Sequence, residues 1–140
     1  MSRRNLLLAL LAVVVAVELL VRDGYENVIE VHLEVLEGLA GKTAAVAASG
    51  GRPTPNDLTE MIYPLERARG FLEDYRDQRQ RESYREFASL VDEYAGLVSA
   101  IDAARGEPER WQAFRGEIQP RVADIDGAAE RVRASLARES

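Results

Sequence analysis

Hydrophobic and polar positions divide the chain into a short apolar beginning and a long helical remainder. Residues 6–21 are apolar except for Glu18, and two arginines precede them. Through residues 22–140, apolar side chains recur at intervals of three and four, the spacing of amphipathic helices. We therefore predict an all-α fold in two parts. Residues 1–21 form a cytoplasmic tip and membrane anchor, and residues 22–140 form a soluble helical bundle.

The first helix of the bundle is predicted over residues 22–48, continuing from the anchor without a break. At 100° per residue its apolar side chains gather on one face, broad enough to touch more than one neighbour. Acidic side chains gather on the opposite side. The apolar face consists of Val17, Val21, Gly24, Val28, Val31, Val35 and Leu39, widened by Ile29, Leu36 and Ala40; the acidic stripe is Glu26, Glu30, Glu34 and Glu37, with Arg22.

Two later helices have clear start signals. Thr54, Pro55 and Asp57 form the pattern of a capping box with proline at the first helical position, and Pro108 begins the last helix in the same way. The last helix has the most regular apolar spacing, so we expect it to need a partner along its whole length. Its stripe is Trp111, Phe114, Ile118, Val122, Ile125, Ala129, Val132 and Leu136.

The segment 76–86 is almost devoid of apolar side chains and leaves two architectures open. One continuous helix through it would give three long helices, and the absence of Gly and Pro favours this. A bend near residues 76–84 would give four helices in an antiparallel bundle. We favour the bend, because a single return helix would overshoot the membrane surface.

The apolar segment 6–21 also has two interpretations. As a helix it covers roughly 24 Å at about 1.5 Å per residue, short of a hydrocarbon core about 30 Å thick. An uncleaved span therefore needs local thinning and a snorkelling Glu18, and it places Tyr25 near the lipid headgroups. A cleaved secretory signal would explain the charged front, but the small residues of a cleavage site are missing. We predict the uncleaved anchor.

The basic residues before the anchor set its orientation. The positive-inside rule keeps Arg3 and Arg4 in the cytoplasm and puts the bundle in the periplasm or outside the cell. The expected location is thus the inner (cell) membrane, spanned once.

Composition excludes several classes of function. The chain has no cysteine, so disulfides and thiolate chemistry are ruled out. Its net charge is −6, and within residues 18–37 six acids face Arg22 alone. This acidic first helix disfavours nucleic acid as a partner.

Candidate catalytic chemistry is equally sparse. His32 is the only histidine and lies on the apolar arc of the first helix, so we expect a core or interface residue. A ferritin-like metal bundle needs two Glu-x-x-His elements, which one histidine cannot supply. We therefore predict no catalytic, metal-binding or cofactor-binding residues and no enzymatic activity.

These observations favour a non-enzymatic accessory or scaffold subunit of a membrane complex. It would contact other subunits through the bundle and the bilayer through residues 6–21. Two alternatives stay open: a ligand-sensing bundle with a pocket near His32 and Tyr94, and a secreted helical binder after signal removal. The candidate partner contacts are Glu18, Val28, His32, Val35, Tyr84, Trp111 and Phe114.

Overall fold

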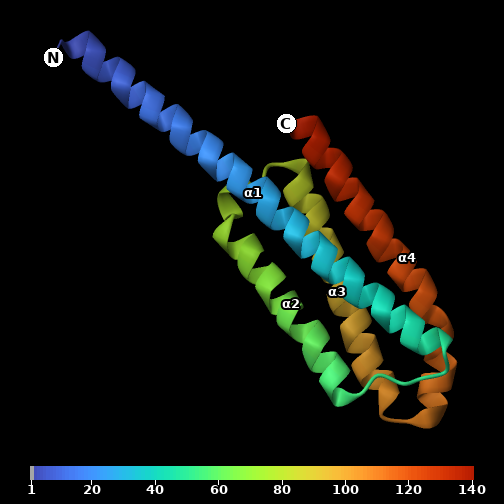
Figure 1. Ribbon diagram of the computed structural model, residues 1–140. Helices are drawn as coiled ribbons and strands as arrows, with labels where there is room; N and C mark the ends of the chain where they lie inside the picture. Colours follow the sequence, from blue (N-terminus) through green and yellow to red (C-terminus); the bar gives the residue numbers. More distant parts are fainter. Residues whose placement is uncertain (1) are drawn as a thin grey trace.

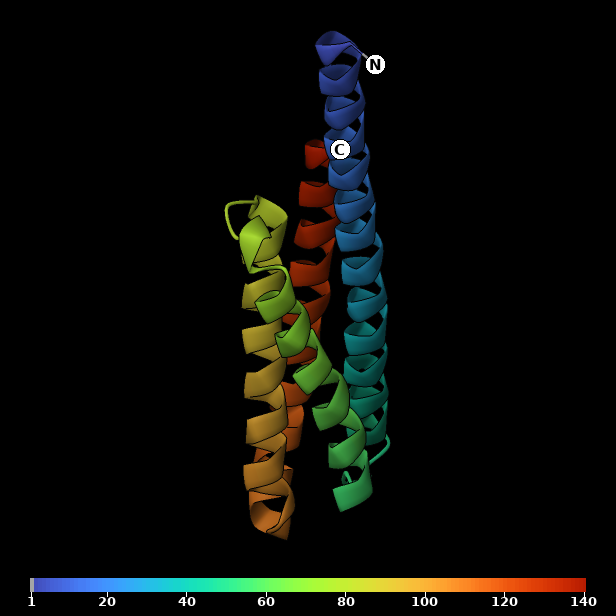
Figure 2. The same ribbon diagram turned by 90° about the vertical axis from the view of Figure 1, so that its left-hand side faces the viewer.

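The computed structural model is a bundle of four helices that run alternately up and down (Figures 1 and 2). It describes residues 2–140, except for the side chains of residues 17–23. No strand occurs in the described part, and the all-α prediction is confirmed. The elements are α1 (Arg3–Ala48), α2 (Pro55–Asp74), the short 3-10 helix η1 (Arg76–Gln78), α3 (Glu82–Arg105) and α4 (Pro108–Glu139).

The polar segment between α2 and α3 is a turn, so the four-helix prediction is confirmed. Arg81 has extended backbone angles, φ −73° and ψ 139°, and α3 begins directly after it. A helix continued through this segment would present almost no apolar surface to a neighbour, whereas a reversal lets α3 pack back along α2. The hydroxyl of Tyr84 in α3 donates a hydrogen bond to the carbonyl of Leu72 in α2.

The start of α2 has the predicted capping box. The Thr54 backbone N–H donates to an Asp57 carboxylate oxygen at 2.8 Å, and the Asp57 N–H donates to the Thr54 hydroxyl at 3.1 Å. Before it, Gly50 has a φ of +87°, which a side chain would strain, and this ends α1. Both α2 and α4 continue as helices through their internal prolines, Pro64 and Pro120.

The apolar stripes of α3 and α4 form a large part of the core. In α3 the apolar residues that recur at helical spacing from Phe87 to Ile101 are buried. In α4, Phe114 and Leu136 are half-buried and the rest of the stripe is buried. The buried positions are Phe87, Leu90, Val91, Tyr94, Leu97, Val98 and Ile101 in α3, and Trp111, Ile118, Val122, Ile125, Ala129 and Val132 in α4.

The prediction of which α1 residues face inward is wrong for the centre of the predicted apolar face. The residues proposed to widen that face, Ile29 and Leu36 among them, are fully buried, whereas the valines at its middle are exposed. Tyr25 is also fully buried, so its expected place near lipid headgroups is wrong. Burying a Tyr, Ile or Leu side chain removes more apolar area from water than burying a Val side chain. The orientation of α1 that turns the larger side chains inward is therefore favoured. The buried face is Tyr25, Ile29, Leu33, Leu36, Ala40, Ala44 and Ala47.

The N-terminal part of α1 projects beyond the other helices (Figure 1). Its leucines and valines from Leu6 to Val15 are between 47% and 67% exposed. Among the described residues, no helix has a stretch long and apolar enough to cross a bilayer. Glu18, predicted at the membrane interface, has its side chain among those that the structure does not describe.

We expect Tyr94→Phe to lower the free energy of unfolding by about 1 kcal/mol, the net value of one buried hydrogen bond. The fully buried Tyr94 hydroxyl donates to the Met61 carbonyl at 3.0 Å, joining α3 to α2. Urea denaturation measures the change. The matched control is Tyr63→Phe. Tyr63 is 59% exposed, so loss of its hydroxyl should lower the free energy of unfolding by less than about 0.5 kcal/mol. Equal losses of stability in the two variants would contradict the assigned role of the hydrogen bond between Tyr94 and Met61.

Candidate interaction surface

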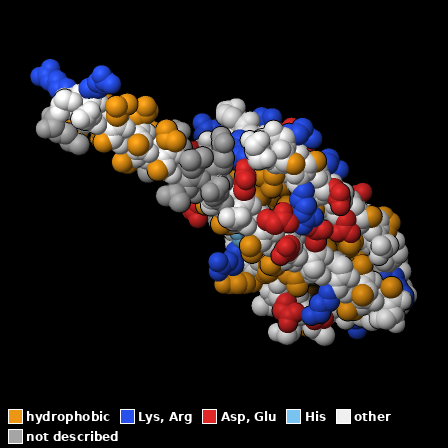
Figure 3. Space-filling view, turned by 45° about the horizontal axis from the view of Figure 1, so that its top comes forward, with side chains coloured by type: hydrophobic (Ala, Val, Ile, Leu, Met, Phe, Trp, Pro, Cys, Tyr) orange, Lys and Arg blue, Asp and Glu red, His pale blue; other side chains and the backbone are white. Residues whose placement is uncertain are grey.

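Three valines of α1 form an uncovered apolar surface. Val28, Val31 and Val35 are 36%, 58% and 41% exposed, and they lie one helical turn apart on the same side of α1. We call them the valine surface. Ile62 and Tyr63 of α2 are also exposed. Figure 3 shows further exposed hydrophobic side chains along the projecting part of α1. Clustered exposed apolar side chains typically mark an interaction site.

A groove of about 410 Å³ runs between the valine surface and α2. Its opposite wall includes Tyr63 and Arg67. An Arg67 guanidinium nitrogen donates to the Tyr63 hydroxyl at 3.1 Å, and the guanidinium carbon lies 5.7 Å from the centre of the Tyr63 ring. The groove is therefore apolar on the α1 side and carries a positive charge on the α2 side.

His32 lies at the base of this groove, half-buried. Its ring centre is 5.4 Å from that of Phe71 and 6.1 Å from that of Phe87. Burial lowers the pKa of His32, and the nearby charge of Arg67 lowers it further. The imidazole is therefore neutral at neutral pH and extends the apolar floor of the groove.

The structure brings only some of the predicted contact residues together. Val28, His32 and Val35 share the groove. Tyr84 is half-buried in the first turn of α3. Trp111 is 2% exposed, and its ring centre lies 6.4 Å from that of the half-buried Phe114 in α4.

The contributions of α2 to the groove were missed. Tyr63 and Arg67 lie off the apolar stripe of their helix, and no spacing rule links them to α1. Tyr94, expected beside a pocket with His32, points into the core, where it bonds to α2.

Most of the acidic stripe of α1 is used within the bundle. One Arg133 nitrogen lies 2.9 Å from a Glu30 carboxylate oxygen and another lies 2.7 Å from one of Glu37, which ties α4 to α1. The Glu37 carboxylate, together with that of Glu30, raises the pKa of Arg133 against the effect of its own burial. Glu30 and Glu37 therefore join α1 to α4, although both lie on the side of α1 opposite the predicted apolar face.

A second polar cluster closes the end of the bundle near the start of α3. The Glu139 carboxylate accepts hydrogen bonds from the Ser83 backbone N–H at 3.0 Å and the Ser83 hydroxyl at 2.6 Å. Because the N-cap Arg81 makes no side-chain cap, a carboxylate from the end of α4 satisfies the first turn of α3. The hydroxyl proton of Ser83 is thus engaged, so Tyr25 donates in the 2.8 Å bond between the two hydroxyls.

Arg81 completes this cluster. It donates to Glu139 at 3.0 Å and forms an ion pair with Glu26 at 3.4 Å. Its guanidinium carbon lies 4.2 Å from the centre of the Tyr25 ring, a cation–π geometry. Burial acts to raise the pKa of Glu139, but hydrogen bonds from Ser83 and Arg81 outweigh it, and the net shift is downward. These contacts join α1, α3 and α4.

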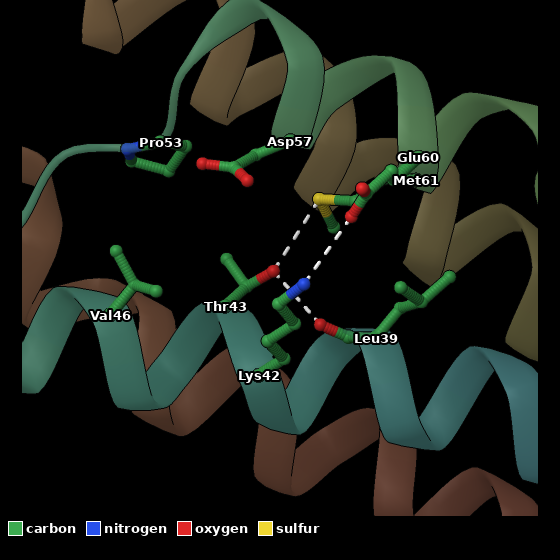
Figure 4. A pocket seen from close by; sticks show the side chains of 8 residues that line it. All are labelled: Leu39, Lys42, Thr43, Val46, Pro53, Asp57, Glu60 and Met61. Carbon is green, nitrogen blue, oxygen red and sulfur yellow. Dashed lines mark hydrogen bonds and ion pairs between the residues drawn. The ribbon is translucent and has the colours of Figure 1, made fainter.

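A small cavity lies between the end of α1 and the start of α2 (Figure 4). Its volume is about 20 Å³, room for about one water molecule. Lys42 and Glu60 form an ion pair across it at 3.3 Å, and the Thr43 hydroxyl lies 3.4 Å from the Met61 sulfur. The cavity is an imperfection in a helix contact and is too small for a ligand.

Within the part of the chain that the structure describes, no three acidic or histidine side chains converge as a metal site would require. Comparisons with protein-family models, curated proteins and solved structures give no match. The valine surface, the groove and the projecting part of α1 are therefore the features that bear on function.

We expect Glu139→Gln to lower the free energy of unfolding at pH 7 by about 1–3 kcal/mol, the range for hydrogen bonds to a charged group. Because the pKa of Glu139 is lowered on folding, its stabilisation is complete above the unfolded value near 4.5 and is lost as pH falls through the lower folded value.

Urea denaturation from pH 7 down to about 3 should therefore show the variant and the parent chain converging at acid pH. Glu130→Gln, at an exposed position of α4, is the matched control and should change little. A gap between Glu139→Gln and the parent that stays constant with pH would contradict the assigned role.

Proposed function

We propose that this protein is a membrane-anchored helical scaffold or accessory subunit that acts by protein contact through the valine surface. One observation carries the proposal: α1 bears an exposed apolar projection and an uncovered apolar surface within the bundle. Both would be unfavourable in water and favourable against lipid and protein respectively.

The projecting part of α1 has the character of a lipid-facing helix. Leu6, Leu7 and Leu8 are consecutive, so they point about 100° apart, and all three are more than half exposed. Apolar residues on every side distinguish this segment from a surface helix with one apolar face. In the sequence the apolar stretch continues as far as Val21. Insertion with the two arginines on the cytoplasmic side places the bundle on the other side of the membrane.

The valine surface supplies the contact with protein. It continues the apolar character of the projection along the same helix, so a partner held in the same membrane would meet it directly. Three valines one turn apart, beside a groove, suit an approaching helix, whose side chains can enter the groove. The partner is then another subunit of a membrane complex.

A ligand-sensing role is the second candidate, and the groove is the observation that favours it. Its volume of about 410 Å³ lies within the range of small-molecule sites, about 300–1,000 Å³, and Arg67 could hold an anionic group. The groove is partly open to solvent, which suits the side chains of an approaching helix better than an enclosed small molecule. A ligand that raises the melting temperature of the parent chain but not of Arg67→Ala would favour sensing.

We expect the full-length chain to fractionate with membranes after alkaline washing, and Val14→Arg to shift it towards the soluble fraction. An arginine at the centre of a membrane helix costs about 2.5–3.5 kcal/mol on insertion scales. Ala123→Arg, at an exposed position of α4, is the control and should stay with membranes. A parent chain found wholly in the soluble fraction would overturn the anchor.

The native mass of the detergent-extracted chain tests the contact role. An assembly heavier than one copy is expected, with the chain itself at its full 15.5 kDa. A chain that is shorter by the apolar segment and soluble would support a secreted binder instead. A full-length monomer with nothing bound would overturn the scaffold proposal.

A further inference from the structure

We propose that the valine surface binds a second copy of this chain, with two α1 helices pairing in parallel. The inference rests on the proposed function, since it takes the valine surface as the contact site and names its occupant. It goes further by giving the register, the direction and the charge pair that select this partner.

The valine surface belongs to a heptad seam that runs along most of α1. The seam positions alternate strictly between steps of three and four, the repeat of a coiled coil. They are Leu7, Leu10, Val14, Val17, Val21, Gly24, Val28, Val31, Val35 and Gly38. A straight helix drifts by about 20° per heptad from such a repeat, so the seam stays in register only against another helix that coils around it.

The bundle leaves this seam uncovered from Val28 to Gly38. At Gly24 the Tyr75 hydroxyl of the same chain lies 3.5 Å from the position that a Cβ would take, so the seam meets the end of α2 there. Val28, Val31, Val35 and Gly38 are exposed, whereas the helices of the same chain cover the neighbouring face that holds Ile29. The seam is therefore a second interface of α1, separate from the one used in folding.

The residue types at the seam favour a close parallel pair. Valine fills the first core position of successive heptads, at Val14, Val21, Val28 and Val35, the position that β-branched residues occupy in two-stranded coiled coils. Gly38 falls at the other core position. A Cβ there would meet nothing within 4 Å in the same chain, and the absence of a side chain lets two backbones approach. Parallel pairing also keeps both N termini on one side of the membrane, as the proposed anchor requires.

Charges beside the seam are complementary between two copies. Glu34 is exposed on one flank, and the groove places Arg67 on the other flank at the level of Val28 and His32. None of the ion pairs among the described residues includes either side chain. A two-fold pair brings Glu34 of each copy towards Arg67 of the other, so the attraction occurs twice.

Single cysteines test the pairing directly, because the full-length chain has none of its own. In mild detergent under oxidation, Val28→Cys and Val35→Cys should each give a disulfide-linked dimer of twice 15.5 kDa. A disulfide needs Cα atoms within about 7 Å, which a parallel in-register pair provides at both positions. An antiparallel pair would link the two variants only when they are mixed, and that result would overturn the proposed direction.

Ser99→Cys is the matched control, since Ser99 is exposed on α3 away from the seam. It should stay monomeric under the same oxidation. Equal linking of the control and both seam variants would mean random collision and would overturn the proposal.

Charge exchange tests the choice of partner. Glu34→Arg and Arg67→Glu should each weaken the dimer by about tenfold, or about 1.4 kcal/mol, and the double variant should restore it. Arg69→Glu, an exposed change elsewhere on α2, is the control and should leave the dimer unchanged. If the double variant does not recover the affinity of the parent dimer, an ion pair between Glu34 and Arg67 is not part of the interface.

The same experiments separate this inference from the function on which it rests. If neither seam variant links but the native mass still shows an assembly with a different protein, the second copy is rejected and the scaffold role stands. A full-length monomer in every condition overturns both.

Discussion

The bundle depends on one constraint: α1 has two adjacent apolar faces, and the other three helices cover only one of them. The covered face includes Tyr25, Ile29, Leu33 and Leu36, and the uncovered face is the valine surface. Larger side chains give more favourable free energy when removed from water, so they take the inward positions. The remaining face stays apolar without a partner in the same chain, and the proposed contact function is assigned to it for this reason.

Polar contacts fix which face of α1 turns inward. Arg133 reaches Glu30 and Glu37 from α4, and Arg81 reaches Glu26 from the start of α3. Rotating α1 to bury its valines would pull these acids away from their arginines. The two polar clusters therefore select one orientation of a helix whose hydrophobic pattern alone allows two.

The sequence was sufficient where a helix had one apolar face and a clear boundary. The stripes of α3 and α4 follow helical spacing, and Thr54 with Asp57 marks the start of α2. The turn near residues 76–84 could be anticipated because a polar segment has little to bury. The groove could not, because Tyr63 and Arg67 reach it from a different helix, and no local pattern records the angle at which α2 crosses α1.

By itself, the sequence determined the helices, their ends and the broad apolar face of α1, because these follow from local spacing and composition. Only the tertiary structure decided which apolar residues of α1 enter the core and which stay on the surface. The choice depends on side-chain volume and on ion pairs between segments more than a hundred residues apart, such as Glu30 with Arg133. A helix pattern states which faces are apolar, and packing decides which of them is left for a partner.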